Sequence, residues 1–323
     1  MKTRRPAHPL PGSRRDGARR AVQAYASAPS AAAGGTMEFR VSVPSGAPCS
    51  VAVRRIGTPV PTPAVRFAGE DQDGAAVAWV RVGDDGSGRG QGTTVQGPDT
   101  GPNAVGTAGR GPNPARVAGP RDPLGADPVG DVGVPLTWCN WEPSLLLDIP
   151  ESWPPGLYVA RFSVEAPLLS AMALRGRSAY VPFVVRGPLA AGFPALVILP
   201  FAAYAAANPW PIADVRRARA ISLDRPFAGN GLPAGFAADA AFVEPLTATD
   251  FATSLDVHAG LIDPGAYRKV LFRTDLWSPR MRSALARAAL SGTDVGGLDG
   301  IPPPSIDFAP GPDGRDDRIL IRY

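Results

Sequence analysis

The sequence predicts a chain of class α/β plus β. Residues 22–186 form an N-terminal, antiparallel β-sandwich-like region, and residues 187–323 form a three-layer α/β region. The first prediction rests on short stretches of alternating apolar and polar residues between Gly and Pro residues, a pattern typical of half-buried strands. The second rests on Ala195–Leu199, an apolar run typical of a strand buried on both faces, and on the strands and helices that alternate after it.

The first part follows a basic tail, residues 1–21, whose composition predicts disorder. Residues 83–135 interrupt the strands with Gly, Pro and Asp, and this insertion is too rich in turn formers to contribute to a core. Trp153, Gly156 and Tyr158 are expected to form a packing corner of the sandwich. The expected strands are Met37–Val43, Cys49–Ile56, Ala76–Val82, Leu145–Ile149, Leu157–Val164 and Val181–Val185.

In the second part, the run Ala195–Ala207 is interrupted by Pro200, which predicts a buried strand followed by a loop. A helix is expected over Pro279–Leu290, with Ser278 as its cap and Pro279 at the first helical position. The other expected strands are Ala218–Leu223, Tyr267–Phe272, Val295–Leu298 and Arg318–Ile321.

Composition excludes several classes of function. The formal charge of +4 lies partly in the basic tail, and elsewhere basic and acidic residues alternate, so we expect no nucleic-acid surface. No apolar run reaches the ~18 residues that span a bilayer, and the N-terminus lacks the apolar core of a signal peptide. Cys49 and Cys139 cannot form a metal cluster alone. They could pair, but a reduced, buried pair in a cytoplasmic protein is the preferred interpretation.

Polar residues near strand ends are candidates for chemistry. Asp275 follows the strand that ends at Phe272, and the carboxyl ends of strands are where ligands gather in open α/β sheets. His258 could act as a base oriented by Asp256, or it could support a loop. Asp224–Arg225 could bind a carboxylate, although an internal ion pair or loop brace is favoured. The sequence has no GxSxG nucleophile elbow, and no GxGxxG follows a strand.

Six short motifs in one order resemble the large (beta) subunit of N,N-dimethylformamidase and its relatives. The resemblance covers most of residues 22–323 and implies a β-rich part followed by a glutamine-amidotransferase-like α/β fold. The motifs are SWPPGLY (152–158), YVPFVVR (180–186), ALVILP (195–200), LDRPF (223–227), SLDVH (254–258) and DLWSPRMR (275–282).

The resemblance also implies amide hydrolysis at a mononuclear iron held by two Tyr and one Glu, since hard anionic oxygens suit iron(III). At the matching positions this chain has Ala207, Phe227 and Asp275, while Tyr204 matches another aromatic residue of the family. Arg273 replaces a family His and would repel a cation. No cofactor is therefore expected. Residues that would bind substrate, by the same resemblance, are Asn208, Trp210, Arg225 and Trp277.

These observations favour a divergent, shortened relative with a degraded iron site and little or no amidohydrolase activity, a pseudoenzyme that binds a small molecule or a protein partner. The alternative is an active amide hydrolase that uses Asp275 and His258, with Asp256, in a rebuilt site. A small partner subunit or self-association is the expected form of assembly, with neither nucleic acid nor membrane as a partner, and the expected location is cytoplasmic.

Overall fold

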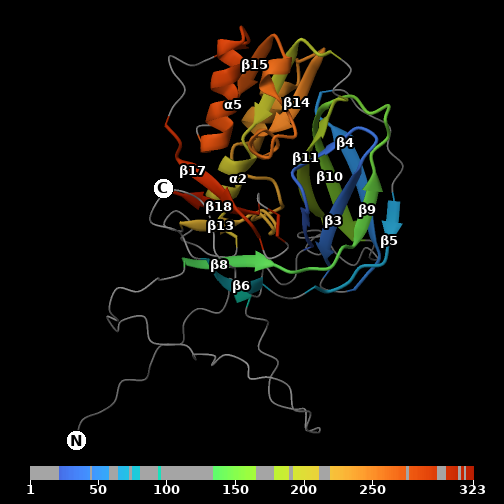
Figure 1. Ribbon diagram of the computed structural model, residues 1–323. Helices are drawn as coiled ribbons and strands as arrows, with labels where there is room; N and C mark the ends of the chain where they lie inside the picture. Colours follow the sequence, from blue (N-terminus) through green and yellow to red (C-terminus); the bar gives the residue numbers. More distant parts are fainter. Residues whose placement is uncertain are drawn as a thin grey trace, which may run out of the picture.

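The computed structural model of this chain has a mixed α/β architecture, with many strands in several sheets and few helices (Figure 1). It describes residues 22–43, 46–57, 65–72, 75–80, 94–95, 134–164, 178–188, 192–210, 219–273, 276–296, 303–311, 314–315 and 318–323.

Two sheets pack face to face in the first part of the chain, as the alternating pattern predicts. Their shared core contains Phe39, whose ring lies 5.3 Å from that of Phe162 and 5.7 Å from that of Phe183. One sheet has the order β1 (Gln23–Ala26), β3 (Thr36–Ser42), β9 (Leu145–Asp148). The other has the order β2 (Ser30–Ala32), β11 (Ser178–Arg186), β10 (Gly156–Val164), β4 (Cys49–Arg55), β5 (Val65–Phe67).

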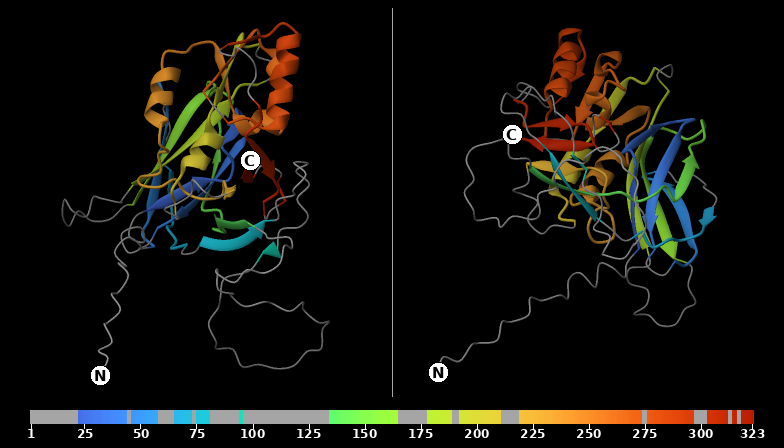
Figure 2. Two further views of the ribbon diagram at one scale, coloured as in Figure 1. Left: turned by 90° about the vertical axis from the view of Figure 1, so that its left-hand side faces the viewer. Right: turned by 60° about the horizontal axis from the view of Figure 1, so that its bottom comes forward.

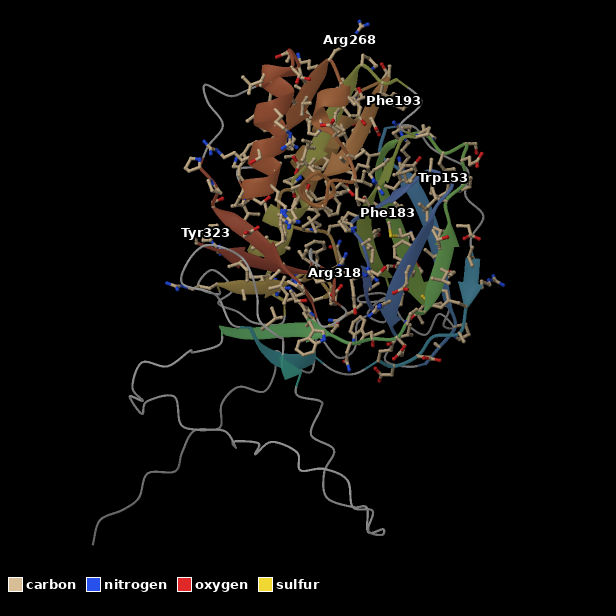
Figure 3. All side chains as sticks on the ribbon, viewed as in Figure 1. Trp153, Phe183, Phe193, Arg268, Arg318 and Tyr323 are labelled. Atoms are coloured by element: carbon tan, nitrogen blue, oxygen red, sulfur yellow. The ribbon has the colours of Figure 1, made fainter. Side chains whose placement is uncertain are left out.

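Most pairs in these two sheets are antiparallel, but β2 runs parallel to β11. The prediction of a purely antiparallel sandwich therefore needs this correction. The predicted packing corner is confirmed. Trp153 and Tyr158 stack with ring centroids 5.0 Å apart, and the Tyr158 hydroxyl donates to the Pro154 carbonyl at 2.7 Å. Figure 3 places Trp153 and Phe183 on the sandwich side of the molecule.

A parallel sheet follows in the order β14 (Thr249–Thr253), β12 (Ala195–Leu199), β15 (Lys269–Phe272), β16 (Asp294–Val295). Strand β12 is buried on both faces, as its apolar run predicts. Leu196 and Ile198 pack in one cluster with α5 (Pro279–Leu290). Val197 and Leu199 pack in another cluster that includes residues of β10 and β11. The sandwich therefore covers the face of the parallel sheet opposite α5 (Figures 1 and 2).

The helices are short except for α5, whose bounds agree with the prediction. Residues 201–207, expected to be a loop, instead form a helix that starts directly after Pro200. Pro limits a helix interior but not its N-terminus, so Pro200 ends β12 without preventing this helix. Among the described residues, the remaining helices are α2 (Phe201–Ala207), α3 (Phe236–Val243), α4 (Ser254–His258) and the 3₁₀ turn η4 (Pro264–Ala266).

Two further antiparallel sheets complete the described fold. One has the order β13 (Ala220–Ser222), β18 (Ile319–Arg322), β17 (Ile306–Ala309), and the other β7 (Thr94–Val95), β6 (Ala75–Val80), β8 (Val134–Cys139). The strands expected near residues 220 and 320 therefore pair with each other and do not extend the parallel sheet. Strand β7 lies within the expected insertion 83–135, and β8 begins at its end. Leu136 and Trp138 of β8 pack against β13 and β18.

No helix among the described residues has the length and apolar character needed to cross a bilayer. Cys49 and Cys139 are both buried and form no disulfide with each other, as the preferred interpretation expects.

Candidate functional site

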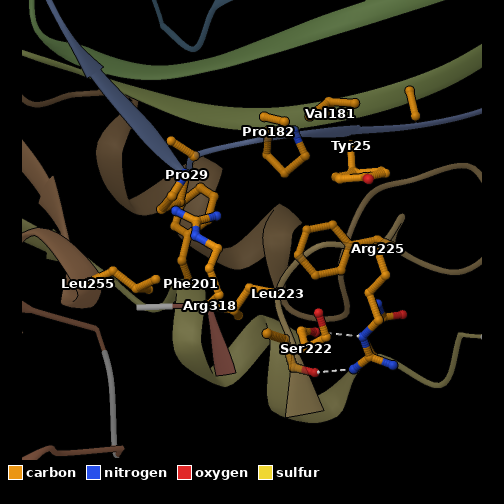
Figure 4. A pocket seen from close by; sticks show the side chains of 16 residues that line it. Tyr25, Pro29, Val181, Pro182, Phe201, Ser222, Leu223, Arg225, Leu255 and Arg318 are labelled. Atoms are coloured by element: carbon orange, nitrogen blue, oxygen red, sulfur yellow. Dashed lines mark hydrogen bonds between the residues drawn. The ribbon is translucent and has the colours of Figure 1, made fainter. Parts of the chain in front are cut away.

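A small pocket lies where the parallel sheet meets the sandwich (Figure 4). Phe201 begins α2 directly after β12, and Leu255 lies in α4 directly after β14, so both follow carboxyl ends of parallel strands. Val181 and Pro182 of β11 line the opposite side. The cavity volume is about 50 Å³. Ligands of open α/β sheets bind at this edge, so the pocket is the candidate binding site.

Asn208 holds the wall of this pocket in place. It is buried at the end of α2, and its side-chain amide donates to the Pro226 carbonyl at 2.9 Å. Its side-chain oxygen accepts from the backbone N–H groups of Trp210 at 3.2 Å and Ala228 at 3.0 Å. The amide thus joins α2 to the loop that carries Phe227, which also lines the pocket.

Arg225 crosses from β13 to the end of α2. Its guanidinium donates to the carbonyls of Ser222 at 2.9 Å, Ala205 at 3.0 Å and Trp210. Burial lowers the pKa of this guanidinium to about 10. Both forms of the interpretation favoured by the sequence are present: Arg225 acts as a loop brace, and Asp224 forms an internal ion pair with Arg318 at 3.3 Å.

Tyr25 and Arg318 complete the polar lining. The Tyr25 hydroxyl donates to the Cys139 carbonyl at 2.9 Å, and burial raises the pKa of its phenol, which therefore stays neutral. The Arg318 side chain is buried, and it donates to the Ser27 carbonyl as well as to Asp224. The sequence did not mark either residue as part of the site, although Arg318 begins one of the expected strands.

Asp256 and His258 lie on α4 with different partners. The Asp256 carboxylate closes a capping box with Thr253, accepts from Ser30 at 2.5 Å and lies 3.5 Å from Arg186. It therefore ties α4 to β2 and β11. The Nδ1 atom of His258 lies 2.8 Å from the Oγ atom of Ser278, the residue that caps α5. The rings of His258 and Phe308 meet edge to face, with centroids 4.6 Å apart.

The remaining predicted residues lie in other surroundings. Trp277 is buried in the cluster between the parallel sheet and α5, with its ring 4.9 Å from that of Phe272. Trp210 is half-buried beside Tyr25, Cys139 and Trp141. Asp275 lies outside the described residues, so its predicted role stays a prediction. The structure thus brings together Asn208, Arg225 and Phe227 at the pocket. The backbone carbonyl of Trp210 accepts a hydrogen bond from Arg225.

A polar network that sequence reasoning missed lies beside Phe227. The Tyr204 hydroxyl donates to Asp239 at 2.5 Å, and Arg273 forms an ion pair with the other carboxylate oxygen at 2.8 Å. Burial and the hydrogen bond to Asp239 raise the pKa of the Tyr204 phenol. The sequence gives little indication of this network, because Asp239 is a single acid within an Ala-rich stretch.

Two of the three positions that the resemblance implies for iron ligands do not fit that metal. Ala207 is exposed and has no donor atom, and the Phe227 ring, 6.3 Å from that of Tyr204, has no oxygen. Among the described residues, no three His, Cys, Asp or Glu side chains gather as they would around a metal ion.

The fold and the pocket define a mixed α/β protein with a candidate ligand site between a parallel sheet and a β-sandwich. Residues 123–299 match the family model described as N,N-dimethylformamidase beta subunit-like, C-terminal, over more than half of the 323-residue chain. The chain belongs to this family, which confirms the resemblance drawn from its motifs. A comparison with curated protein sequences finds no match.

Proposed function

We propose that this family member binds a small organic molecule in the pocket at the carboxyl ends of β12 and β14, without the iron-dependent amide hydrolysis implied by its family. The observation that carries the proposal is the pocket wall itself. Phe227 places a hydrocarbon ring where the resemblance implies a phenolate ligand. The hydroxyl of Tyr204, the nearby phenol, is already hydrogen-bonded to Asp239.

The physical argument concerns both charge and donors. Iron(III) needs several anionic oxygens, and Tyr204 is held in its neutral form because burial and Asp239 raise its pKa. Asp239, the carboxylate beside this phenol, is already neutralised by Arg273. A pocket lined by Phe201, Leu255 and Phe227 still supplies apolar contact for a small ligand.

The test has two arms. Protein purified after expression in iron-supplemented medium is measured for iron content, for phenolate-to-iron charge-transfer absorption and for hydrolysis of N,N-dimethylformamide. We expect less than one iron per ten chains (~0.1), no such band and no turnover above buffer. Stoichiometric iron with the absorption band would overturn the loss of the metal site.

The second arm tests binding. Saturation-transfer NMR with a mixture of small amides and carboxylates should detect ligands on the wild type. The signal should be lost in Ala28→Leu, because Ala28 is only partly buried where it lines the pocket and a larger side chain there fills the space. A signal that is unchanged in this variant places the ligand elsewhere on the chain.

The alternative function is an active amide hydrolase that uses Asp275 and His258. The observation in its favour is the 2.8 Å contact between His258 and the Ser278 hydroxyl, since a base within hydrogen-bond reach of a hydroxyl is a requirement of nucleophilic catalysis. The bonding of Ser278 opposes it: the residue is fully buried and caps α5. If any amide is hydrolysed, His258→Ala and Asp275→Asn should each abolish that activity under the alternative.

Four finer expectations belong to the same proposal. They are a glutamine-amidotransferase-like, three-layer arrangement of residues 187–323, a division near Gly187, a small partner subunit or self-association, and a cytoplasmic location. The membership in a beta subunit-like family supports the partner subunit. Two buried cysteines without a disulfide between them suit a reducing compartment. Size-exclusion chromatography with light scattering tests self-association directly.

A further inference from the structure

Arg225 carries a positive charge into the pocket wall, and no carboxylate among the described residues is hydrogen-bonded to it. Its side chain is buried, and among the residues that the structure describes its hydrogen-bond partners are the carbonyls of Ser222, Ala205 and Trp210, with no carboxylate. Carbonyl dipoles satisfy N–H groups, but they do not neutralise a charge. A buried cation of this kind is costly unless it is paired.

The neighbouring described side chains do not neutralise the positive charge of Arg225. Asp224 is engaged by Arg318, the other cation that lines the pocket. Cys139 interacts electrostatically with Arg225, but burial raises the pKa of its thiol, so it stays neutral. The phenol of Tyr25 is also neutral. Among the described residues that line the pocket, the ionised side chains are therefore Arg225 and Arg318, and none of them is an acid.

The hydrogen bonds formed within the described residues do not use all N–H groups of the Arg225 guanidinium. An arginine side chain has five N–H groups, and the hydrogen bonds formed within the described residues use one on each nitrogen. The two that remain belong to the terminal nitrogens, where a carboxylate can be bound. Figure 4 shows Arg225 on the side of the pocket opposite Val181 and Pro182.

Pocket size and wall chemistry define the rest of the ligand. A volume of about 50 Å³ is several times the ~10–15 Å³ that one water-sized probe needs, so the enclosed space suits only a very small molecule. Phe201, Phe227, Leu255 and Val181 surround that space with hydrocarbon. The ligand therefore has a short apolar body and one polar end.

From these observations we infer that the pocket selects a short aliphatic monocarboxylate, whose carboxylate pairs with Arg225 and whose alkyl group packs against Phe201 and Leu255. This inference rests on the proposed function, because it names the ligand class of the same pocket. It differs from a purely structural role for Arg225, which would leave the pocket indifferent to ligand charge.

The experiment compares propionate with propionamide, which have the same shape but differ in charge. Dissociation constants are measured by NMR titration of the full chain at a constant ionic strength set with sodium chloride. We expect propionate to bind at least about tenfold more tightly than propionamide, the factor expected for a hydrogen-bonded charge pair. In Arg225→Gln the preference should fall to about onefold to twofold, whereas Arg225→Lys, which keeps the charge, should retain part of it.

The outcomes separate the two proposals. Propionamide binding as well as or better than propionate overturns the carboxylate inference and leaves the proposed function standing. Binding of neither molecule overturns the carboxylate inference, whereas the proposed function is overturned only if the mixture of small amides and carboxylates also gives no signal. Propionate binding that persists unchanged in Ala28→Leu places the anion outside the pocket and overturns the inference. Circular dichroism verifies folding of Arg225→Gln, and if that variant is unfolded, the wild-type ratio together with Ala28→Leu decides the matter.

Discussion

Asn208 shows how one side chain keeps the pocket wall in its observed form. A single amide serves one carbonyl and two backbone N–H groups, all within the turn between α2 and the loop that carries Phe227. Backbone groups in such a buried turn need partners, because an unpaired buried donor or acceptor costs free energy. At the scale of the residue, the site is therefore organised by hydrogen bonds to the backbone more than by charge pairs.

Replacing Asn208 with Ala should lower the free energy of unfolding by about 2–3 kcal/mol, because three backbone groups lose their partner. Urea unfolding followed by tryptophan fluorescence measures the change. Asn230→Ala is the matched control: its exposed side-chain oxygen accepts from Leu232 N–H at 3.2 Å, and its loss should cost less than about 1 kcal/mol. Equal losses in the two variants would contradict this account of the wall.

At the scale of the element, α4 and α5 are joined end to end through Ser278. Its hydroxyl caps α5 by accepting from Met281 N–H at 3.2 Å and also contacts His258 at the last position of α4. The two helices cover one face of the parallel sheet together. The lone buried histidine of the described chain is thereby explained by packing and by a helix cap.

Ser278→Ala should destabilise the chain by about 1–3 kcal/mol, since it removes a cap and leaves the His258 ring without its hydroxyl partner. The control is Ser283→Ala in the exposed middle of α5, where Ala has the higher helix propensity and the change should be close to zero or slightly stabilising. Thermal unfolding by circular dichroism compares the two variants. If both variants unfold at the same temperature, the contact of Ser278 with α4 and α5 contributes nothing to stability.

At the scale of the whole molecule, the sandwich and the α/β part share backbone contacts as well as a core. Tyr180 of β11 donates its N–H to the carbonyl of Asn230 at 2.8 Å, and its own carbonyl lies against Gly231. Gly231 has φ +93°, and an added Cβ would lie 2.1 Å from that carbonyl oxygen. The close approach of the two parts requires glycine at this position.

Gly231→Ala should therefore destabilise the chain more strongly than Gly229→Ala. Both have positive φ, but a Cβ at Gly229 meets open space. The control should lose only the left-handed backbone cost of about 1–2 kcal/mol, while Gly231→Ala adds a steric clash worth at least about 2 kcal/mol more. Chemical unfolding of both variants measures the difference. Similar losses would show that the two parts do not depend on this approach.

The buried tyrosines make stability sensitive to alkali. Burial raises the pKa of Tyr158 to about 12 from its ordinary 10.0, so the folded chain holds this proton more tightly than the unfolded chain does. The resulting stability is fully present below pH 10 and is lost as the pH rises from 10 to 12. Tyr25, Tyr204 and Tyr267, whose pKa values are also raised by burial, act in the same direction.

Tyr158→Phe should flatten this pH dependence by about 2 kcal/mol between about pH 9 and pH 12, although the variant loses the hydrogen bond to Pro154 at every pH. Urea unfolding across that range measures the slope for wild type and variant. A slope that is unchanged in Tyr158→Phe would contradict the role assigned to this phenol.

Local patterns were sufficient for several elements because burial imposes them directly. Alternation in Met37–Val43 produced β3, the apolar run Ala195–Leu199 produced β12, and Ser278–Pro279 marked the start of α5. The loop expected at residues 201–207 is a helix, because Pro200 stands before the first helical residue and therefore does not break it. Strand β14 was also missed, because Thr249 and Asp250 read as polar although both are buried.

Only those residues of the site that lie in short sequence motifs were predictable. Asn208 and Arg225 were found from short motifs, but nothing local indicates that Arg318 and Tyr25 meet them, since about 290 residues separate these two along the chain. Pocket walls are assembled from several elements, and no single segment records which other segments will face it.

By itself, the sequence determined the family, the two kinds of architecture and the absence of oxygen at two expected metal-ligand positions. These follow from residue identity and periodicity, which are local properties. Only the tertiary structure decided which charges are paired. In the folded chain Asp224 pairs with Arg318, and Asp239 pairs with Arg273 and accepts a hydrogen bond from Tyr204. Arg225 is hydrogen-bonded to carbonyl groups. Such pairing depends on distances between side chains that lie far apart in the sequence.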